Sequence, residues 1–167
     1  MEQIKLINLE NVSEEEANKY DFRETARAVV LNRDNLVALV YAKNRNYFTV
    51  PGGGIDENEN HEMAAKREVK EEIGYDIEII KEIGFTTEYR KPSGLKQIAY
   101  CYLAKIVGEK GEPNLTQDEI EEGCETLWLS IEDAIKKIQE TNNDIYWWPY
   151  VKIREVAFLE EVNQNLK

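Results

Sequence analysis

Short apolar runs occupy the region after residue 24, and they predict β-strands. The segments 25–32 (TARAVVLN) and 36–42 (LVALVYA) are rich in valine and leucine, residues that favour strands. The intervening RDN at 33–35 is typical of a turn, so the two runs are expected to form a hairpin. A third run, YFTV at 47–50, leads into Pro51. Strands are therefore expected before the first helix.

The first helical period follows three consecutive glycines. Ala65, Val69 and Ile73 step by four residues and form an apolar stripe. Asn60 is a suitable N-cap, and Gly74 suits the position just beyond the helix end. We therefore expect a helix of about three and a half turns between these two residues.

The second half of the chain predicts more strands and then helices. Residues 75–91 fit one bent strand or two, with Gly84 at the break, and residues 95–107 form the longest strand candidate. A turn is expected at 92–94, a polar loop at 108–123 and a short strand at 125–130. A helix is expected from 131, and a C-terminal helix at 145–167.

Several strands around one internal helix, with further helices at the end, predict an α+β fold. The expected architecture is an α/β/α sandwich with a mixed β-sheet. A length of 167 residues favours a single domain over 1–167. The polar, acidic residues 1–22 are expected to form an N-terminal extension of that domain.

Composition and charge narrow the class of partner. The net charge of −12 argues against nucleic acid, because phosphate backbones are bound by clustered Lys and Arg. A small anionic substrate is still compatible, since screening limits charge effects to about 8 Å. No apolar run is long enough for a membrane span, so no membrane partner is expected. The N-terminus has no basic start or apolar core of a secretion signal, so a cytoplasmic location is expected.

The helix after the glycines carries an unusual acidic face. Glu68, Glu71 and Glu72 share one side of the helix, next to the apolar stripe. Glu68 has no basic residue three or four positions away, whereas a solvated helix gains from such pairs. Crowded carboxylates raise one another's pKa, and a hard divalent cation such as Mg²⁺ or Mn²⁺ removes that repulsion. The alternative is an acidic surface helix in an acidic protein.

The same residues closely resemble the box of the Nudix hydrolase family (MutT-like), G-x5-E-x7-R-E-U-x-E-E-x-G-U, where U is a bulky aliphatic residue. Every fixed position matches, and only Tyr75 departs from it, at the last packing position. The matching residues are Gly53, Glu59, Arg67-Glu68-Val69, Glu71-Glu72 and Gly74.

The resemblance implies a metal-dependent enzyme that hydrolyses a nucleoside diphosphate linked to another group. Glu68 and Glu72 would be the main ligands of Mg²⁺ or Mn²⁺, with Glu71 and the Gly52 carbonyl completing the site. Glu59 would pair with Arg67 and hold the helix to the loop. The bound cation would neutralise phosphate charge and activate the attacking water.

The residue that accepts the proton of that water is left open between two places. One candidate is Glu68, and the other is an acid of the loop 118–125: Glu119, Glu121, Glu122 or Glu125. Simple solvation is the alternative for each loop acid. The expected substrate-binding residues are Arg27, Phe48, Gly53, Glu119 and Glu122.

The box indicates the reaction, whereas loops elsewhere select the substrate. The favoured substrate is a small nucleotide, such as a nucleoside triphosphate or an oxidised nucleotide. ADP-ribose or a nucleoside diphosphate sugar is the alternative. A non-catalytic nucleotide sensor is the rival from another class, although such a module would be expected to lose carboxylates that this chain keeps. The aromatic cluster Trp147-Trp148-Pro149-Tyr150 suits core packing, a stacking wall or a homodimer surface.

Overall fold

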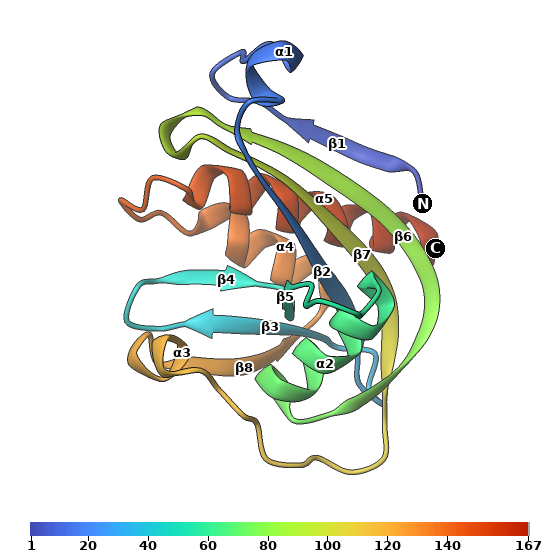
Figure 1. Cartoon of the computed structure of the whole chain (residues 1–167). Helices are drawn as coiled ribbons and strands as arrows, with labels where there is room; N and C mark the ends of the chain where they lie inside the picture. The colour runs from blue at the N-terminus through green and yellow to red at the C-terminus, as the bar shows by residue number, and fades with distance from the viewer. Residues whose placement is uncertain (167) are drawn as a thin grey trace.

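The computed structural model describes residues 1–166, which form one eight-stranded mixed β-sheet with helices on both faces (Figure 1). The strand order is β1-β6-β7-β2-β3-β4, with β5 paired to β2 and β8 paired to β3. The pairs β1–β6 and β2–β7 are parallel, and the other pairs are antiparallel. The predicted α+β fold with a mixed sheet is confirmed.

The elements follow the expected order along the chain. The strands are β1 (Gln3–Ile7), β2 (Asp21–Leu31), β3 (Val37–Ala42), β4 (Tyr47–Thr49), β5 (Gly52–Gly54), β6 (Asp76–Arg90), β7 (Leu95–Val107) and β8 (Cys124–Leu129). The helices are α1 (Glu14–Ala17), α2 (His61–Ile73), the 3₁₀ turn η1 (Lys91–Ser93), α3 (Gln117–Glu121), α4 (Ile131–Glu140) and α5 (Trp148–Leu166). No helix in this part of the chain is both long and apolar enough to cross a membrane.

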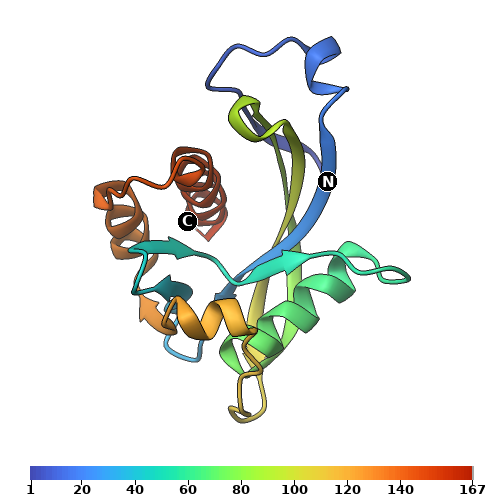
Figure 2. The same cartoon turned by 60° about the vertical axis from the view of Figure 1, so that its left-hand side comes forward.

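The sheet separates two apolar clusters, and Figure 2 shows α2 on one side of it and α4 and α5 on the other. Helix α2 packs against one face, where Val69 meets Ala28 and Val30 of β2. Helices α4 and α5 pack against the other face, where Phe158 shares a cluster with Val29. Neighbouring residues of β2 reach different clusters because side chains alternate along a strand. Alternation thus decides which β2 residues meet α2 and which meet α5.

Helix α2 has the ends that its sequence predicts. The Asn60 side chain accepts a hydrogen bond from the Met63 N–H at 2.8 Å. Gly74 has a φ of 78° and closes the last turn by donating to the Lys70 carbonyl. Since a left-handed residue at this position is tolerated best by glycine, the prediction of both caps is confirmed.

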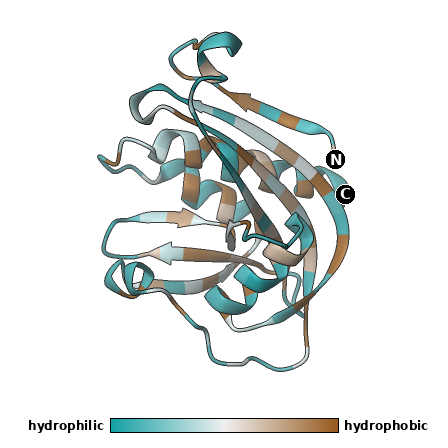
Figure 3. Ribbon diagram, viewed as in Figure 1, coloured by the Kyte–Doolittle hydropathy of each residue, from teal (hydrophilic) through white to brown (hydrophobic). Residues whose placement is uncertain are grey.

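Strand β6 settles the alternative left open for residues 75–91. It runs without interruption from Asp76 to Arg90, and its register shifts between Glu82 and Gly84. Figure 3 shows hydrophilic and hydrophobic bands alternating along this strand. The segment is therefore one bent strand, because the glycine accommodates the irregular backbone without ending the pairing.

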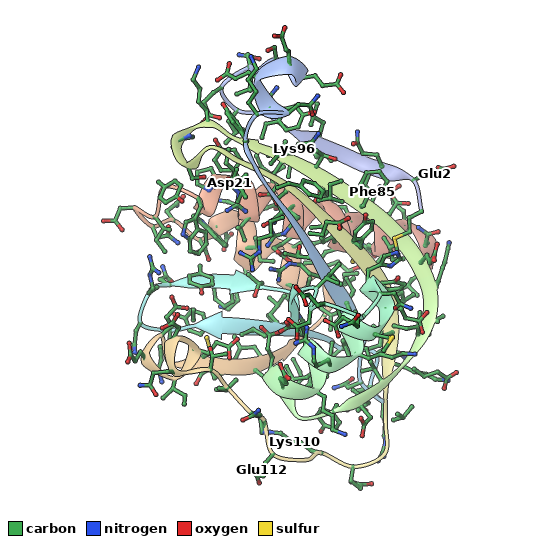
Figure 4. All side chains as sticks on the ribbon, viewed as in Figure 1. Glu2, Asp21, Phe85, Lys96, Lys110 and Glu112 are labelled. Atoms are coloured by element: carbon green, nitrogen blue, oxygen red, sulfur yellow. The ribbon has the colours of Figure 1, made fainter. Side chains whose placement is uncertain are left out.

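The segment 108–123 differs from its prediction as a loop. The polar loop 108–123 contains α3, whose N-cap Thr116 forms a capping box with Glu119. The T-x-x-E pattern was therefore a helix signal in the sequence. The rest of that loop passes below α2 in Figure 4, which labels Lys110 and Glu112. The Gly111 N–H donates to the Gly74 carbonyl and so connects this loop to the end of α2.

The two ends of the described chain add to the domain. Strand β1, within the expected N-terminal extension 1–22, pairs with β6 in parallel and forms one edge of the sheet. Helix α5 begins at Trp148, three residues after the predicted start at 145. Lys167, the last residue of the predicted C-terminal helix, lies outside the described residues.

Candidate functional site

The all-glycine strand β5 brings two glutamates of α2 against its backbone. A Cβ atom on Gly53 would lie 2.6 Å from the carboxyl carbon and both oxygens of Glu68. The Gly52 N–H donates to Glu72 Oε2 at 2.7 Å, and Gly52 has a φ of 145°. A side chain at either glycine would collide with neighbouring atoms. The missing side chain of Gly53 therefore leaves the space that the Glu68 carboxylate occupies, and that of Gly52 lets β5 approach Ala26 and Arg27 of β2.

Both carboxylates line a cleft of about 590 Å³, a size suited to a small ligand. Glu68, Glu72 and Glu119 form an acidic end of this cleft. Arginines from β2, β6 and α5 line it as well: Arg23, Arg27, Arg90 and Arg154. The cleft therefore offers anionic and cationic side chains to one ligand, although the chain as a whole is strongly acidic.

Arg67 donates several hydrogen bonds next to the acidic end of the cleft. Its guanidinium donates to both oxygens of Glu59, at 2.6 and 3.2 Å. It also donates to Glu68 at 2.9 Å, to Glu71 at 3.2 Å and to the Gly54 carbonyl at 2.9 Å. The bond from Arg67 lowers the pKa of Glu59. Arg67 thus joins the loop, the glycine strand and the helix, and Glu71 lies on its side rather than on the cleft wall.

The carboxyl group of Glu72 is partly buried, and few neighbouring groups stabilise its ionised form. Burial raises the pKa of Glu72 to about 8, although Arg27 and the Gly52 N–H act in the opposite direction. Burial also raises the pKa of Glu68, and it outweighs the hydrogen bond from Arg67. Removing a carboxylate from water disfavours its ionised form unless a cation or strong donor is near. A cation at this position would therefore be stabilising.

The donors at the acidic end are oxygens, the type that Mg²⁺ and Mn²⁺ prefer. Among residues 1–166, however, no three acidic, histidine or cysteine side chains are already arranged as a ligand cluster. The reason is visible in the hydrogen bonds, since Arg67 holds Glu68 and Glu71, while Glu72 bonds to Gly52. The donor set fits a hard dication, and the Glu68 side chain would turn from Arg67 to bind it.

An ionic network lies between α5 and the sheet, beside the cleft. Glu88 accepts hydrogen bonds from Arg90 at 2.6 Å and from Arg154 at 2.9 Å. Arg154 also donates to Glu155 Oε1 at 2.8 and 2.5 Å. Burial acts to raise the pKa of Glu88, but Arg154 and Arg90 outweigh it and lower that pKa. These charges therefore compensate one another inside the protein.

Arg27 lines the cleft from β2 and is almost completely enclosed. Its Nη1 donates to the Val50 carbonyl at 3.0 Å, and its Nε has no hydrogen-bond partner among residues 1–166. Burial lowers the pKa of Arg27, and Arg154 adds to that effect. The structure thus brings Arg27 to the cleft, with its Nε enclosed 3.8 Å from Glu155 Oε1.

Phe48 does not lie in this cleft, which corrects its expected contact with the substrate. Alternation along β4 directs Tyr47 and Thr49 into the cleft and Phe48 to another surface. There Phe48 is buried, stacks on Tyr41 with ring centroids 4.3 Å apart, and lines a separate groove of about 790 Å³. Of the two aromatic residues in that strand, Tyr47 is therefore the one placed to meet a ligand.

The two loop acids also have different positions. Glu119 lines the cleft, although one of its oxygens accepts from the Thr116 N–H at 2.7 Å. Glu122 does not line it, because its carboxylate accepts from the Tyr47 hydroxyl at 2.5 Å and from Arg45 at 3.0 Å. Glu122 therefore orients the cleft residue Tyr47 without facing the cleft itself.

The aromatic cluster near the start of α5 is divided between the core and the cleft. Trp148 and Tyr150 are buried. Trp147 lines the cleft and meets Tyr47 edge to face, with ring centroids 5.0 Å apart. Thr25, another lining residue, has a buried hydroxyl that finds no hydrogen-bond partner within residues 1–166. Packing and cleft formation thus both use this cluster.

Several lining residues were not in the predicted set. Alternation along β2 was a signal for Arg23, which shares a face with Thr25 and Arg27. Nothing local indicated Gln97 or Arg154, because they come from distant elements that meet only in the folded chain.

Comparisons with known proteins identify the family. The model of the NUDIX domain matches residues 21–149, so this chain belongs to the Nudix family, and it is a hydrolase of that family. Nudix hydrolases generally use divalent metal ions and act on phosphoric anhydride bonds of nucleotides. The predicted family is therefore confirmed.

Individual relatives are more distant. An RNA pyrophosphohydrolase of Pelagibacter ubique is 26% identical over 141 residues, which cover 77% of this chain and 89% of the relative. An 8-oxo-(d)GTP phosphatase of Mycolicibacterium smegmatis is 30% identical over 62% of this chain, but over only 30% of its own length. A solved Nudix hydrolase from Nitrosomonas europaea has a TM-score of 0.66 at 19% identity, covering 87% of this chain and 90% of its own. That structural likeness supports the fold alone.

Proposed function

We propose that this protein hydrolyses the phosphoric anhydride bond of a small nucleotide, such as a nucleoside triphosphate or an oxidised nucleotide. The observation that carries the proposal is the pairing of Glu68 and Glu72 at one end of a cleft that arginines also line. A diphosphate needs cationic contacts, and two buried carboxylates would repel it unless they held a cation. Mg²⁺, or Mn²⁺, is the proposed ion.

Each residue has a distinct part in this proposal. Glu68 and Glu72 hold the dication, and the backbone of Gly52 contributes from the strand. The ladder supports this role, because the Ala28 N–H bonds to the Pro51 carbonyl, and alternation directs the polar groups of Gly52 away from β2. When bound, the metal neutralises phosphate charge and makes the attacking water more acidic.

Arginines and glycines position the substrate. Arg23 Nη2 lies 3.9 Å from the position of a Cβ on Gly54, so this guanidinium is near the glycine strand and can meet a phosphate. Arg27 adds a positive charge to the cleft from the same strand. The all-glycine backbone at Gly53 lets the phosphates approach closely. Arg67 and Glu59 keep the strand and the helix in register for this contact.

The proton acceptor is proposed to be Glu68 or Glu119. Among the loop acids considered, Glu119 lines the cleft, whereas Glu122 is held by Tyr47 and Arg45. Glu119 keeps one carboxylate oxygen outside its capping bond. This oxygen can accept a proton in the cleft, and it makes Glu119 the stronger of the loop candidates.

The nucleoside is proposed to lie toward Tyr47 and Trp147. These rings give the cleft a flat apolar wall on which a base can stack, and the cleft has the volume of a nucleotide site. ADP-ribose and nucleoside diphosphate sugars are the main alternatives, since the same wall and arginines could hold them. We further propose that residues 1–167 act as one domain; a homodimer and a cytoplasmic location stay predictions.

A substrate panel tests the proposal. The protein is incubated with Mg²⁺ and nucleoside triphosphates, oxidised triphosphates, ADP-ribose, sugar nucleotides, dinucleoside polyphosphates or a 5′-triphosphorylated RNA oligomer, and products are identified by mass. Release of a nucleoside monophosphate and inorganic pyrophosphate from a triphosphate, with one water consumed, is expected. Preferential cleavage of ADP-ribose or a sugar nucleotide would establish the alternative. Efficient cleavage of the RNA end would overturn the exclusion of nucleic acid. Binding of nucleotides without any turnover would identify a sensor instead.

A further inference from the structure

A buried carboxylate of the last helix reaches the residue just before the glycine strand. Glu155 of α5 is fully buried and does not line the cleft. Its Oε2 accepts from the N–H of Val50, 105 positions away, at 2.9 Å. The carbonyl of Val50 accepts from Arg27 Nη1 at 3.0 Å. Charged side chains from two elements therefore hold both polar groups of this one residue.

Val50 needs such partners because strand pairing ends beside it. The ladder between β3 and β4 pairs Val40 with Thr49 and goes no further. A buried backbone N–H without a partner is costly, and Glu155 supplies that partner. The bond is therefore a specific replacement for a missing strand contact.

Pro51 and Gly52 connect Val50 to the acidic end of the cleft. The Pro51 carbonyl accepts from the Ala28 N–H at 2.9 Å, and the Gly52 N–H donates to Glu72 at 2.7 Å. The proline ring restricts the backbone between them. A displacement of Val50 would therefore move the amide that orients Glu72.

We propose that Glu155 is a positioning residue that acts on the metal end of the cleft. It places Gly52 relative to Glu72 through Val50, so that the carboxylate is preorganised for its dication. The inference rests on the proposed function, which assigns the cation to Glu72. Groups that orient metal ligands from behind affect metal affinity without touching the ion.

Two conservative variants separate this role from merely structural ion pairs with Arg154 and with Arg27, whose Nε lies 3.8 Å from Glu155 Oε1. Glu155→Gln keeps an oxygen at the same reach, so it can still accept from Val50, but it loses the charge. Glu155→Asp keeps the charge but is one methylene shorter, so it cannot reach Val50 in the same way. A structural ion pair predicts that loss of charge does the greater harm, whereas the positioning role predicts that loss of reach does.

The experiment measures Mn²⁺ binding to metal-free protein without nucleotide, by electron paramagnetic resonance. Glu155→Asp is expected to weaken Mn²⁺ binding about tenfold, and Glu155→Gln by less than about threefold. Hydrogen exchange of the Val50 and Gly52 amides should be faster in Glu155→Asp than in the parent protein. Glu88→Gln is the matched control, because it removes a carboxylate of the same network that has no bond to Val50; its Mn²⁺ affinity should stay close to that of the parent.

The outcomes separate this inference from the proposed function. Unchanged Mn²⁺ binding and amide exchange in Glu155→Asp would overturn the positioning role, as would a greater loss in Glu155→Gln than in Glu155→Asp. Glu72→Gln is measured alongside. If Glu72→Gln abolishes Mn²⁺ binding while Glu155→Asp has no effect, only the positioning role fails. If Glu72→Gln binds Mn²⁺ normally, the assignment of the cation to Glu72 fails as well.

Discussion

Glu72 and Glu88 are both glutamates withdrawn from solvent beside the same cleft, Glu88 completely and Glu72 partly, and their charges have opposite status. Two arginines bond directly to Glu88 and lower its pKa, although burial acts to raise it. Glu72 bonds to one backbone N–H, and its pKa is raised to about 8. Burial acts to raise the pKa in both cases, so the opposite outcomes come from the partners. The negative charge of Glu88 is balanced by two arginines of the fold, whereas Glu72 has no directly bonded arginine or lysine among residues 1–166.

The contrast distinguishes a structural charge from a functional one. The compensated pair holds α5 on the sheet, and its removal should damage the fold. The uncompensated carboxylate costs stability in the absence of a cation, and its removal should damage activity instead. Four substitutions or conditions test this division.

Neutralising the acidic end is expected to have the largest effect. Glu72→Gln and Glu68→Gln should each lower metal-dependent turnover about a thousandfold, because the charge that holds the cation is lost. Neither change should lower the melting temperature of metal-free protein, since each removes a poorly compensated buried charge. Turnover of the best panel substrate and thermal unfolding in EDTA provide the measurements. Near-normal turnover in both variants would remove these residues from the mechanism.

Removing the compensated carboxylate should affect stability next most strongly. Glu88→Ala is expected to lower the free energy of unfolding by about 3 kcal/mol, because Arg90 and Arg154 stay buried without their partner. The control is Glu78→Ala, because Glu78 lies on β6 like Glu88 but forms an exposed ion pair with Lys105 of β7. Its expected change in the free energy of unfolding is about 0.5 kcal/mol or less. Urea unfolding measures both, and equal losses would contradict the comparison.

Filling the space at one glycine should affect the acidic end alone. Gly53→Ala places a methyl group where the Glu68 carboxylate lies, so turnover should fall about tenfold to a hundredfold through misplacement of that group. Gly54→Ala is the neighbouring control, since the atom nearest its Cβ position is 3.9 Å away. Steady-state kinetics across Mg²⁺ concentrations compare the two variants. A loss in Gly54→Ala as large as in Gly53→Ala would show that the strand tolerates no alanine at all.

Acid should reveal the compensated charge with the smallest effect. The folded pKa of Glu88 lies below its unfolded value of about 4.3. Its stabilising contribution is therefore fully present above the unfolded pKa and is lost as the pH falls through the folded pKa. Urea unfolding between pH 6 and pH 3 should show the parent losing stability below about pH 4, with a shallower decline in Glu88→Gln. Parallel declines would show that Glu88 does not carry this dependence.

Local features of the site were predictable from the sequence. The caps at Asn60 and Gly74, the apolar stripe of α2 and the acidic face all follow from spacing within a few residues. Arg67 could be placed near Glu71 and Glu59 by helical spacing and by the family resemblance. These effects act over one or two helical turns, so the order of residues is enough to determine them.

The surroundings of the site were decided by tertiary structure. The sequence did not indicate that Arg154 and Glu155 would meet Glu88 and Val50, 66 and 105 positions away. It favoured Phe48 as a substrate contact, whereas alternation along β4 places Tyr47 in the cleft and Phe48 outside it. Such contacts depend on which faces pack together across the sheet, and the period of a strand does not say which face will meet which helix. The sequence by itself thus determined the acidic helix α2 and the family of the chain, and the packing of α5 decided which buried charges are compensated and which side chains line the cleft.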